Sequence, residues 1–123
     1  MSSAGQPEPS RSDLDREYSP STVVGDIGPY LREYAEASAA ARVAAGRRAA
    51  VDVAYGPGPS LDLLPPPDAG STWPVLVYFH GGFWQELSRT DSAFAAPAMW
   101  SAGAGLVAPD YTLAPHADLD QIV

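Results

Sequence analysis

The chain has 123 residues, the length of one ordinary domain, and 46% of them are hydrophobic, which suffices for a core. Fifteen acidic residues against seven basic ones give a formal net charge of −8, which disfavours nucleic acid and anionic membranes as partners. Cysteine is absent, so disulfides, thiolate metal sites and a cysteine nucleophile are excluded, and a cytoplasmic location is expected.

The first segment, residues 1–17, is rich in Ser, Pro and charged residues and has few apolar ones. Ordering such a segment costs backbone entropy that no burial offsets, so a flexible leader is predicted. Residues 18–123 are then predicted to form a single, incomplete domain.

A helix is predicted from Ile27 to about Ala45. Apolar and small residues recur there at spacings of three and four, which is typical of an amphipathic helix. Pro29 suits the first turn of such a helix, and Gly46 suits its C-terminal stop. The start and stop signals therefore agree with the periodicity.

Three strands and a turn region are predicted next. Residues 51–55 and 61–64 alternate between apolar and polar types and are separated by a Gly/Pro loop, which indicates two short strands. Residues 75–79 are apolar at every position, which is typical of a strand covered on both faces. We therefore expect this last strand near the middle of a sheet.

The C-terminal third predicts a helix at 92–102, whose regular part begins near Pro97, and a strand at 105–111. A strand, a helix and a strand in this order imply a right-handed crossover and parallel pairing. The fold class is therefore α/β, with about four strands and an extra N-terminal helix. Asp118 and Gln121 resemble a capping box that starts another helix just before the chain ends, so the domain looks interrupted.

The apolar strand ends in the turn His80-Gly81-Gly82-Phe83-Trp84. Stabilising an oxyanion in acyl transfer requires backbone N–H groups that have no partner within the protein. Glycines permit backbone angles closed to other residues and let a substrate approach the main chain. The turn can therefore serve as an oxyanion hole, although a tight turn that only connects two elements fits the same pattern.

This turn and two later segments resemble the N-terminal region of α/β-hydrolases in the hormone-sensitive-lipase and arylformamidase (kynurenine formamidase) group. The segments that carry the resemblance are HGGFWQ at 80–85, GLV at 105–107 and DYTLAP at 110–115. The aromatic pair after two glycines is more similar to the arylformamidase branch. The resemblance implies that the N–H groups of Gly82 and Phe83 are oxyanion donors, that His80 and Gly81 shape the loop, and that Phe83 and Trp84 line the substrate pocket.

The nucleophile that the resemblance implies is missing from the chain. No Gly-x-Ser-x-Gly segment occurs, and Ser101 lies in the predicted helix rather than at a strand-to-helix turn. His116 follows Ala-Pro in a loop, where a solvated histidine is ordinary. Together, His80, Asp110 and His116 have no metal-ligand spacing. We therefore assign no nucleophile, no metal and no cofactor.

The sequence thus predicts an N-terminal fragment of a serine-type carboxylic ester or amide hydrolase, arylformamidase-like, which contributes the oxyanion hole and is inactive alone. Its partner would be a small ester or amide substrate. The alternatives are a catalytically inactive truncated product, a half of a split protein that pairs with a C-terminal half, and a small binding module. We expect strand 75–79 to be an unprotected apolar edge without later neighbours, so the chain should not fold alone.

Overall fold

The computed structural model describes residues 8–19, 24–68 and 70–123, which fall into two compact units, 1–30 and 31–123. In the first unit, helix α1 (Arg11–Glu17) begins with a reciprocal pair of hydrogen bonds between Ser10 and Asp13, each 3.2 Å long. No residue of α1 is buried. Residues 1–7 of the predicted flexible leader lie outside the described residues. The helix within 11–17 was not expected, and it forms because a capping box satisfies backbone groups locally without a core.

Helix α3 (Gly28–Ala45) confirms the predicted amphipathic helix. The carboxylate of Asp26 accepts a hydrogen bond from the N–H of Gly28 at 2.8 Å, and Pro29 occupies the first turn. Gly46, with φ of +58°, follows the helix and begins the short 3-10 helix η1 (Gly46–Arg48). The buried face of α3 consists of the small side chains of Ser38, Ala41 and Ala45.

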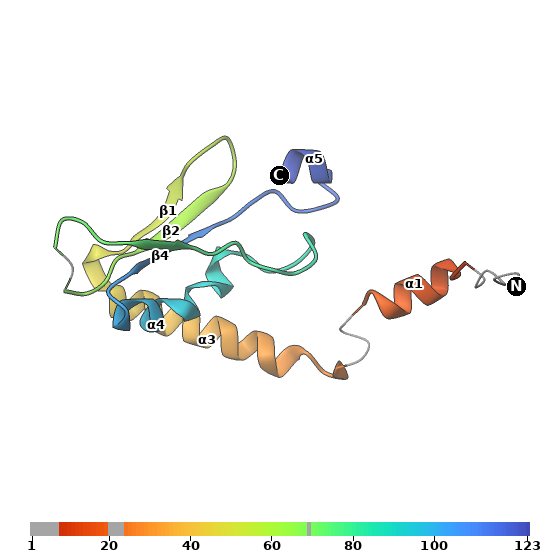
Figure 1. Ribbon diagram of the computed structural model, residues 1–123, viewed down its shortest axis with the longest axis horizontal. Coiled ribbons are helices and arrows are strands. Elements are labelled where there is room, and N and C mark those ends of the chain that lie inside the picture. The colour runs from red at the N-terminus through yellow and green to blue at the C-terminus, as the bar shows by residue number, and fades with distance from the viewer. Residues whose placement is uncertain (1–7, 20–23, 69) are drawn as a thin grey trace, which may run out of the picture. The chain divides into compact units, whose positions relative to one another are not determined.

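A four-stranded mixed sheet forms the centre of the second unit (Figure 1). Its strands are β1 (Ala50–Ala54), β2 (Ser60–Leu64), β3 (Val75–Val77) and β4 (Gly105–Pro109), in the order β1-β2-β4-β3. The first two strands pair antiparallel, as do β2 and β4, whereas β3 and β4 are parallel. The prediction of four strands with a parallel crossover between the last two is confirmed.

Helices α3 and α4 (Ala96–Ser101) lie along the same side of the sheet (Figure 1). Two 3-10 helices, η2 (Arg89–Asp91) and η3 (Ala93–Ala95), precede α4, and Pro97 stands in its first turn, as predicted. The core between these helices and the sheet is made of small and branched apolar residues: Ala41, Ala45, Leu64, Ala93, Ala96 and Leu106. Near the C-terminus, the predicted capping box of Asp118 and Gln121 begins α5 (Leu119–Ile122).

The predicted central position of strand 75–79 is wrong for this chain, because β3 is the edge of the sheet. Its three residues are 46%, 40% and 50% exposed. Within the described residues no strand pairs with the outer side of β3, so its apolar side chains stay in contact with solvent. The expectation of an unprotected apolar edge is therefore confirmed, whereas coverage on both faces is not.

The longest described helix is α3, with 18 residues. It carries four charged residues, Arg32, Glu33, Glu36 and Arg42, which interrupt any apolar run. Among the described residues, no helix is both long enough and apolar enough to cross a membrane. The cytoplasmic location stays a prediction from the sequence.

Candidate functional site

The turn after β3 has an unusual backbone. Gly82, Phe83 and Trp84 all have positive φ angles, of 105°, 53° and 58°. The carbonyl of Gly82 accepts hydrogen bonds from the N–H groups of Gln85 and Glu86, at 3.0 and 3.1 Å. A Cβ at position 82 would lie 2.2 Å from the carbonyl oxygen of Glu86, so only glycine fits there. The turn is tight, and two non-glycine residues hold a disfavoured left-handed conformation.

Several backbone donors of this turn, Gly82 and Phe83 among them, have no hydrogen-bond partner in the described residues. Within the part of the chain that the structure describes, no hydrogen bond has the N–H of Gly82 or Phe83 as its donor. A pocket of about 400 Å³ lies at the turn, lined by His80, Gly81, Gly82, Phe83, Trp84 and Tyr111. The rings of Phe83 and Trp84 meet edge to face, with centroids 6.5 Å apart, and both rings are partly exposed. The pocket therefore combines apolar walls with free backbone donors nearby.

His80 is 5% exposed and is held on several sides. Its Nδ1 lies 2.9 Å from the carbonyl oxygen of Gly81, and because a carbonyl only accepts, Nδ1 carries the proton in this contact. Its ring stacks on Tyr111 with centroids 4.4 Å apart and an interplanar angle of 11°. The hydroxyl of Tyr111 also donates to the carbonyl of His80 at 2.7 Å. Both the ring and the backbone of His80 are thus fixed.

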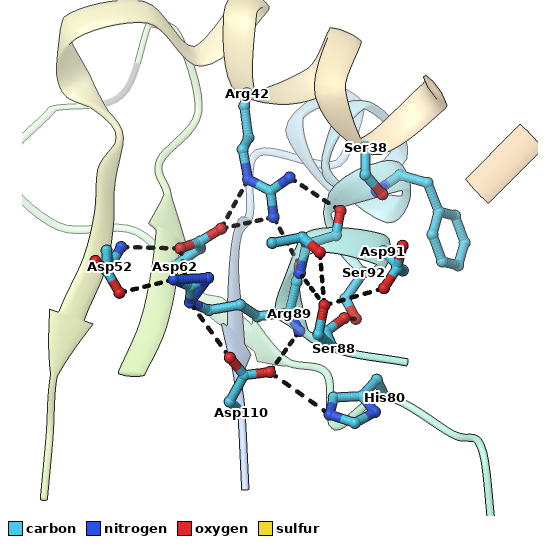
Figure 2. A network of polar contacts seen from close by, with 12 residues as sticks. Ser38, Arg42, Asp52, Asp62, His80, Ser88, Arg89, Asp91, Ser92 and Asp110 are labelled. Atoms are coloured by element: carbon cyan, nitrogen blue, oxygen red, sulfur yellow. Dashed lines mark hydrogen bonds and ion pairs between the residues drawn. The ribbon is translucent and has the colours of Figure 1, made fainter. Parts of the chain in front are cut away.

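Asp110, directly after β4, contacts both ends of the segment 80–89 (Figure 2). Its Oδ1 accepts a hydrogen bond from the backbone N–H of Arg89 at 2.6 Å. The same oxygen lies 3.6 Å from Nε2 of His80, and Oδ2 lies 3.5 Å from Nε of Arg89. Asp110 therefore holds the segment that follows the glycine turn.

A buried carboxylate, Asp62 of β2, lies behind this segment and is 1% exposed. Arg42 of α3 places two guanidinium nitrogens 2.7 Å from Oδ2 of Asp62. Arg42 also donates to the carbonyls of Arg89 and Thr90, at 2.7 and 2.9 Å. Figure 2 shows that this guanidinium lies between the helix, β2 and the segment after the turn. Arg42 therefore joins α3, β2 and the segment after the turn. Its guanidinium also pairs with the buried carboxylate of Asp62, and a buried charge is tolerated only when it is paired and hydrogen-bonded.

Arg89 is the second cation of this network. Its terminal nitrogen donates to Asp52 at 2.7 Å, and its Nε lies 3.5 Å from Asp62. Of the buried side-chain polar atoms in the described residues, Nε of Arg89 alone has no hydrogen bond. Sequence reasoning missed Arg42, Asp62 and Arg89. The sequence did contain one indication of this network: Asp62 lies within the otherwise mostly apolar strand Ser60–Leu64, and a buried carboxylate needs a buried cationic partner.

Two tyrosine hydroxyls are also tied to this region. Burial, and secondarily the negative charge of Asp110, raises the pKa of Tyr111 above its ordinary value of 10.0. The same two causes raise the pKa of Tyr55, whose hydroxyl donates to the backbone carbonyl of Asp110. Both hydroxyls therefore stay protonated, and able to donate, well above neutral pH.

The remaining candidates from the sequence, Ser101 and His116, form no hydrogen bond or ion pair with the glycine turn among the described residues. Ser101 is exposed in α4, and its hydroxyl donates to the carbonyl of Pro97 at 3.0 Å. His116 is exposed in a loop. Among the described residues, neither Ser101 nor His116 forms a hydrogen bond or ion pair with His80, whereas Asp110 does lie within ion-pair distance of it. No group of three or more His, Cys, Asp or Glu side chains in the described ranges could hold a metal ion.

Comparison with known proteins gives two kinds of relative, and no family model matches the chain. A kynurenine formamidase of Danio rerio is 34% identical over 120 residues, which cover 93% of this chain and 41% of that protein. One from Salmo salar is 30% identical over 119 residues, covering 92% and 40%. The chain therefore spans about two fifths of the length of these relatives.

Solved structures give the same fold. A proposed thioesterase from Silicibacter sp. has a TM-score of 0.78 and 24% identity, covering 89% of this chain and 42% of that one. An esterase of Pyrobaculum calidifontis has a TM-score of 0.52 and 22% identity, covering 79% and 33%. At these identities the likeness shows the fold alone. The prediction from sequence is confirmed: the chain has the fold of the N-terminal part of an α/β-hydrolase, and its sequence resembles the kynurenine formamidases of the arylformamidase-like branch.

Proposed function

We propose that this chain supplies the oxyanion-binding half of a serine-type hydrolase that cleaves carboxylic esters or amides. The observation that carries the proposal is the pair of unpaired N–H groups on Gly82 and Phe83 beside an aromatic-lined pocket. Donors of this kind stabilise the negative charge that develops on a carbonyl oxygen during acyl transfer. A turn of fixed shape needs little reorganisation when that charge appears.

The substrate class in this proposal is a small aryl ester or aryl formamide. The similarity to kynurenine formamidases supports the arylformamidase-like assignment. The rings of Phe83, Trp84 and Tyr111 at the pocket suit an aromatic or apolar group on the substrate. His80 and Gly81 shape the turn in this proposal and do not react themselves.

The nucleophile of this reaction lies outside these 123 residues. The sequence has no Gly-x-Ser-x-Gly segment, and Ser101 lies in a helix with its hydroxyl bonded to the preceding turn. An oxyanion hole without a nucleophile and base does not complete acyl transfer. We therefore expect the 123-residue chain by itself to be inactive.

The test compares two proteins on 4-nitrophenyl acetate and on an N-formyl aryl amine. The complete natural polypeptide should hydrolyse at least one of them and lose that activity after labelling with a serine-directed fluorophosphonate. The 123-residue chain should hydrolyse neither. Activity of the short chain that disappears in Ser101→Ala would contradict the assignment of the nucleophile. A complete polypeptide inert on both substrates would contradict the hydrolase proposal.

A second candidate is a split protein whose other half supplies the remaining strands. The exposed apolar edge of β3 favours it, because unpaired strand edges bind further strands. Co-expression of this chain with a separately encoded C-terminal half should then restore fluorophosphonate labelling on the second chain. A small binding module, by contrast, would take up an aromatic ligand at Phe83 and Trp84 without any second chain.

A further inference from the structure

We propose that Asp110 is a positioning residue that ties together the two ends of segment 80–89 and so sets the direction of the N–H groups of Gly82 and Phe83. The consequence for catalysis rests on the proposed function. The consequence for the conformation of the turn does not, because it concerns only contacts within this chain.

The carboxylate of Asp110 lies between the backbone N–H of Arg89 and the imidazole of His80. Oδ1 of Asp110 accepts from the N–H of Arg89 at 2.6 Å, and lies 3.6 Å from Nε2 of His80. His80 begins the glycine turn, and Arg89 begins the 3-10 helix η2 that follows it. One oxygen atom therefore accepts a hydrogen bond from the residue at one end of the turn and lies within ion-pair distance of the imidazole at the other end (Figure 2).

The neighbouring residue, Tyr111, also contacts His80, from a different side than Asp110. Its ring stacks on the imidazole, and its hydroxyl donates to the carbonyl of His80 at 2.7 Å. Asp110 and Tyr111 are adjacent and directly follow β4, the strand that pairs in parallel with β3. The end of β4 thus holds the residue at which the chain leaves β3 and enters the turn.

The backbone between His80 and Arg89 adopts disfavoured angles that need external support. Phe83, Trp84 and Leu87 have positive φ, as does Gly82, and only glycine adopts such angles without strain. Disfavoured angles of this kind persist only where the surrounding contacts over-determine them. Hydrogen bonds from Gln85 and Glu86 to Gly82 close the turn from inside, and Asp110 closes it from outside.

The charges around Asp110 also favour this arrangement. Nε of Arg89 lies 3.5 Å from Oδ2 of Asp110, and the same guanidinium binds Asp52 and lies near the buried Asp62. Arg42 in turn holds the carbonyl of Arg89 at 2.7 Å. The far end of the turn is therefore anchored on both its N–H and its carbonyl.

The test substitutes Asp110→Asn in the complete natural polypeptide, with Asp52→Asn as the matched control. Both changes remove one carboxylate paired with Arg89, but Asp52 is 71% exposed and has no contact with His80. Misplaced oxyanion donors lower kcat more than they change KM, so we expect Asp110→Asn to lower kcat about tenfold or more and Asp52→Asn about twofold or less. Asp110→Ala, which also removes the acceptor for Arg89, should lower kcat further, to about 100-fold.

The second measurement is amide hydrogen exchange in residues 81–87 of the same variants, which needs no activity. Asp110→Asn should speed exchange in this segment several-fold, and Asp52→Asn should leave it as in the parent protein. Equal losses of kcat in the two variants, or unchanged exchange at 81–87 in Asp110→Asn, would overturn the proposal. If the parent protein hydrolyses neither 4-nitrophenyl acetate nor the N-formyl aryl amine, the proposed function fails, and exchange alone decides the role of Asp110.

Discussion

Strands β2 and β3 show opposite relations between hydrophobicity and burial. The segment Ser60–Leu64 contains a carboxylate, yet Asp62 is among the most deeply buried side chains of the molecule. The segment Val75–Val77 is wholly apolar, yet all three of its residues are exposed. The difference follows from neighbours: β2 lies between two strands, whereas β3 has one. Position in the sheet therefore decides burial, and the composition of a strand alone does not.

The largest expected effect comes from removing the buried carboxylate. In Asp62→Ala, Arg42 and Arg89 lose their shared partner, and breaking a buried ion pair costs about 3 to 5 kcal/mol. Denaturant unfolding of the complete natural polypeptide should show this loss in the free energy of unfolding. Asp68→Ala, at an exposed position, should change the same quantity by about 0.5 kcal/mol or less.

The second largest effect is expected from paired leucines in β3 and β4 that differ in burial. Leu76 and Leu106 are partners in the parallel ladder, but they are 40% and 0% exposed. Leu106→Ala should lower the free energy of unfolding by about 3 kcal/mol, and Leu76→Ala by about 1 kcal/mol, because only the first leaves a cavity in the core. Equal losses of the free energy of unfolding in the complete polypeptide would show that further strands cover the outer side of β3 there.

The glycine turn gives a third, smaller effect on stability. In Gly82→Ala the new Cβ would meet the carbonyl oxygen of Glu86 at 2.2 Å, so the backbone must shift. We expect denaturant unfolding of the complete polypeptide to show a loss of about 2 kcal/mol, and the proposed function predicts the loss of most hydrolysis as well. Gly81→Ala is the matched variant, since its Cβ would have no atom within 4 Å. If both variants lose stability equally, the close approach at position 82 does not control the turn.

The smallest expected effect is on alkaline stability. The folded-state pKa of Tyr111 and of Tyr55 is raised, so above pH 10.0 the unfolded chain releases these protons first. The stabilisation is therefore fully present below pH 10.0 and is lost as pH rises through the folded-state pKa values. Melting temperatures measured from pH 8 to 12 should fall less steeply in Tyr111→Phe than in the parent. An equally steep fall of the melting temperature in both proteins would show that the raised pKa of Tyr111 does not contribute to alkaline stability.

Much of the fold could be read from local patterns. The bounds of α3, the hairpin of β1 and β2, and the start of α4 near Pro97 follow from periodicity, turn residues and proline geometry. The capping box of Asp118 and Gln121 is local as well. These features need contacts only a few residues apart, which is why sequence reasoning found them.

In the candidate site, some features follow from the sequence and others only from the tertiary structure. The sequence by itself determined the composition of the turn, because only glycine can occupy position 82 with its φ of 105° and its contact with Glu86. Only the tertiary structure decided which residues surround that turn. Asp110 reaches His80 because β4 pairs in parallel with β3, and Arg42 reaches Asp62 because α3 packs on the sheet. Contacts between residues 20 to 48 positions apart depend on strand order and helix packing, which no local pattern encodes.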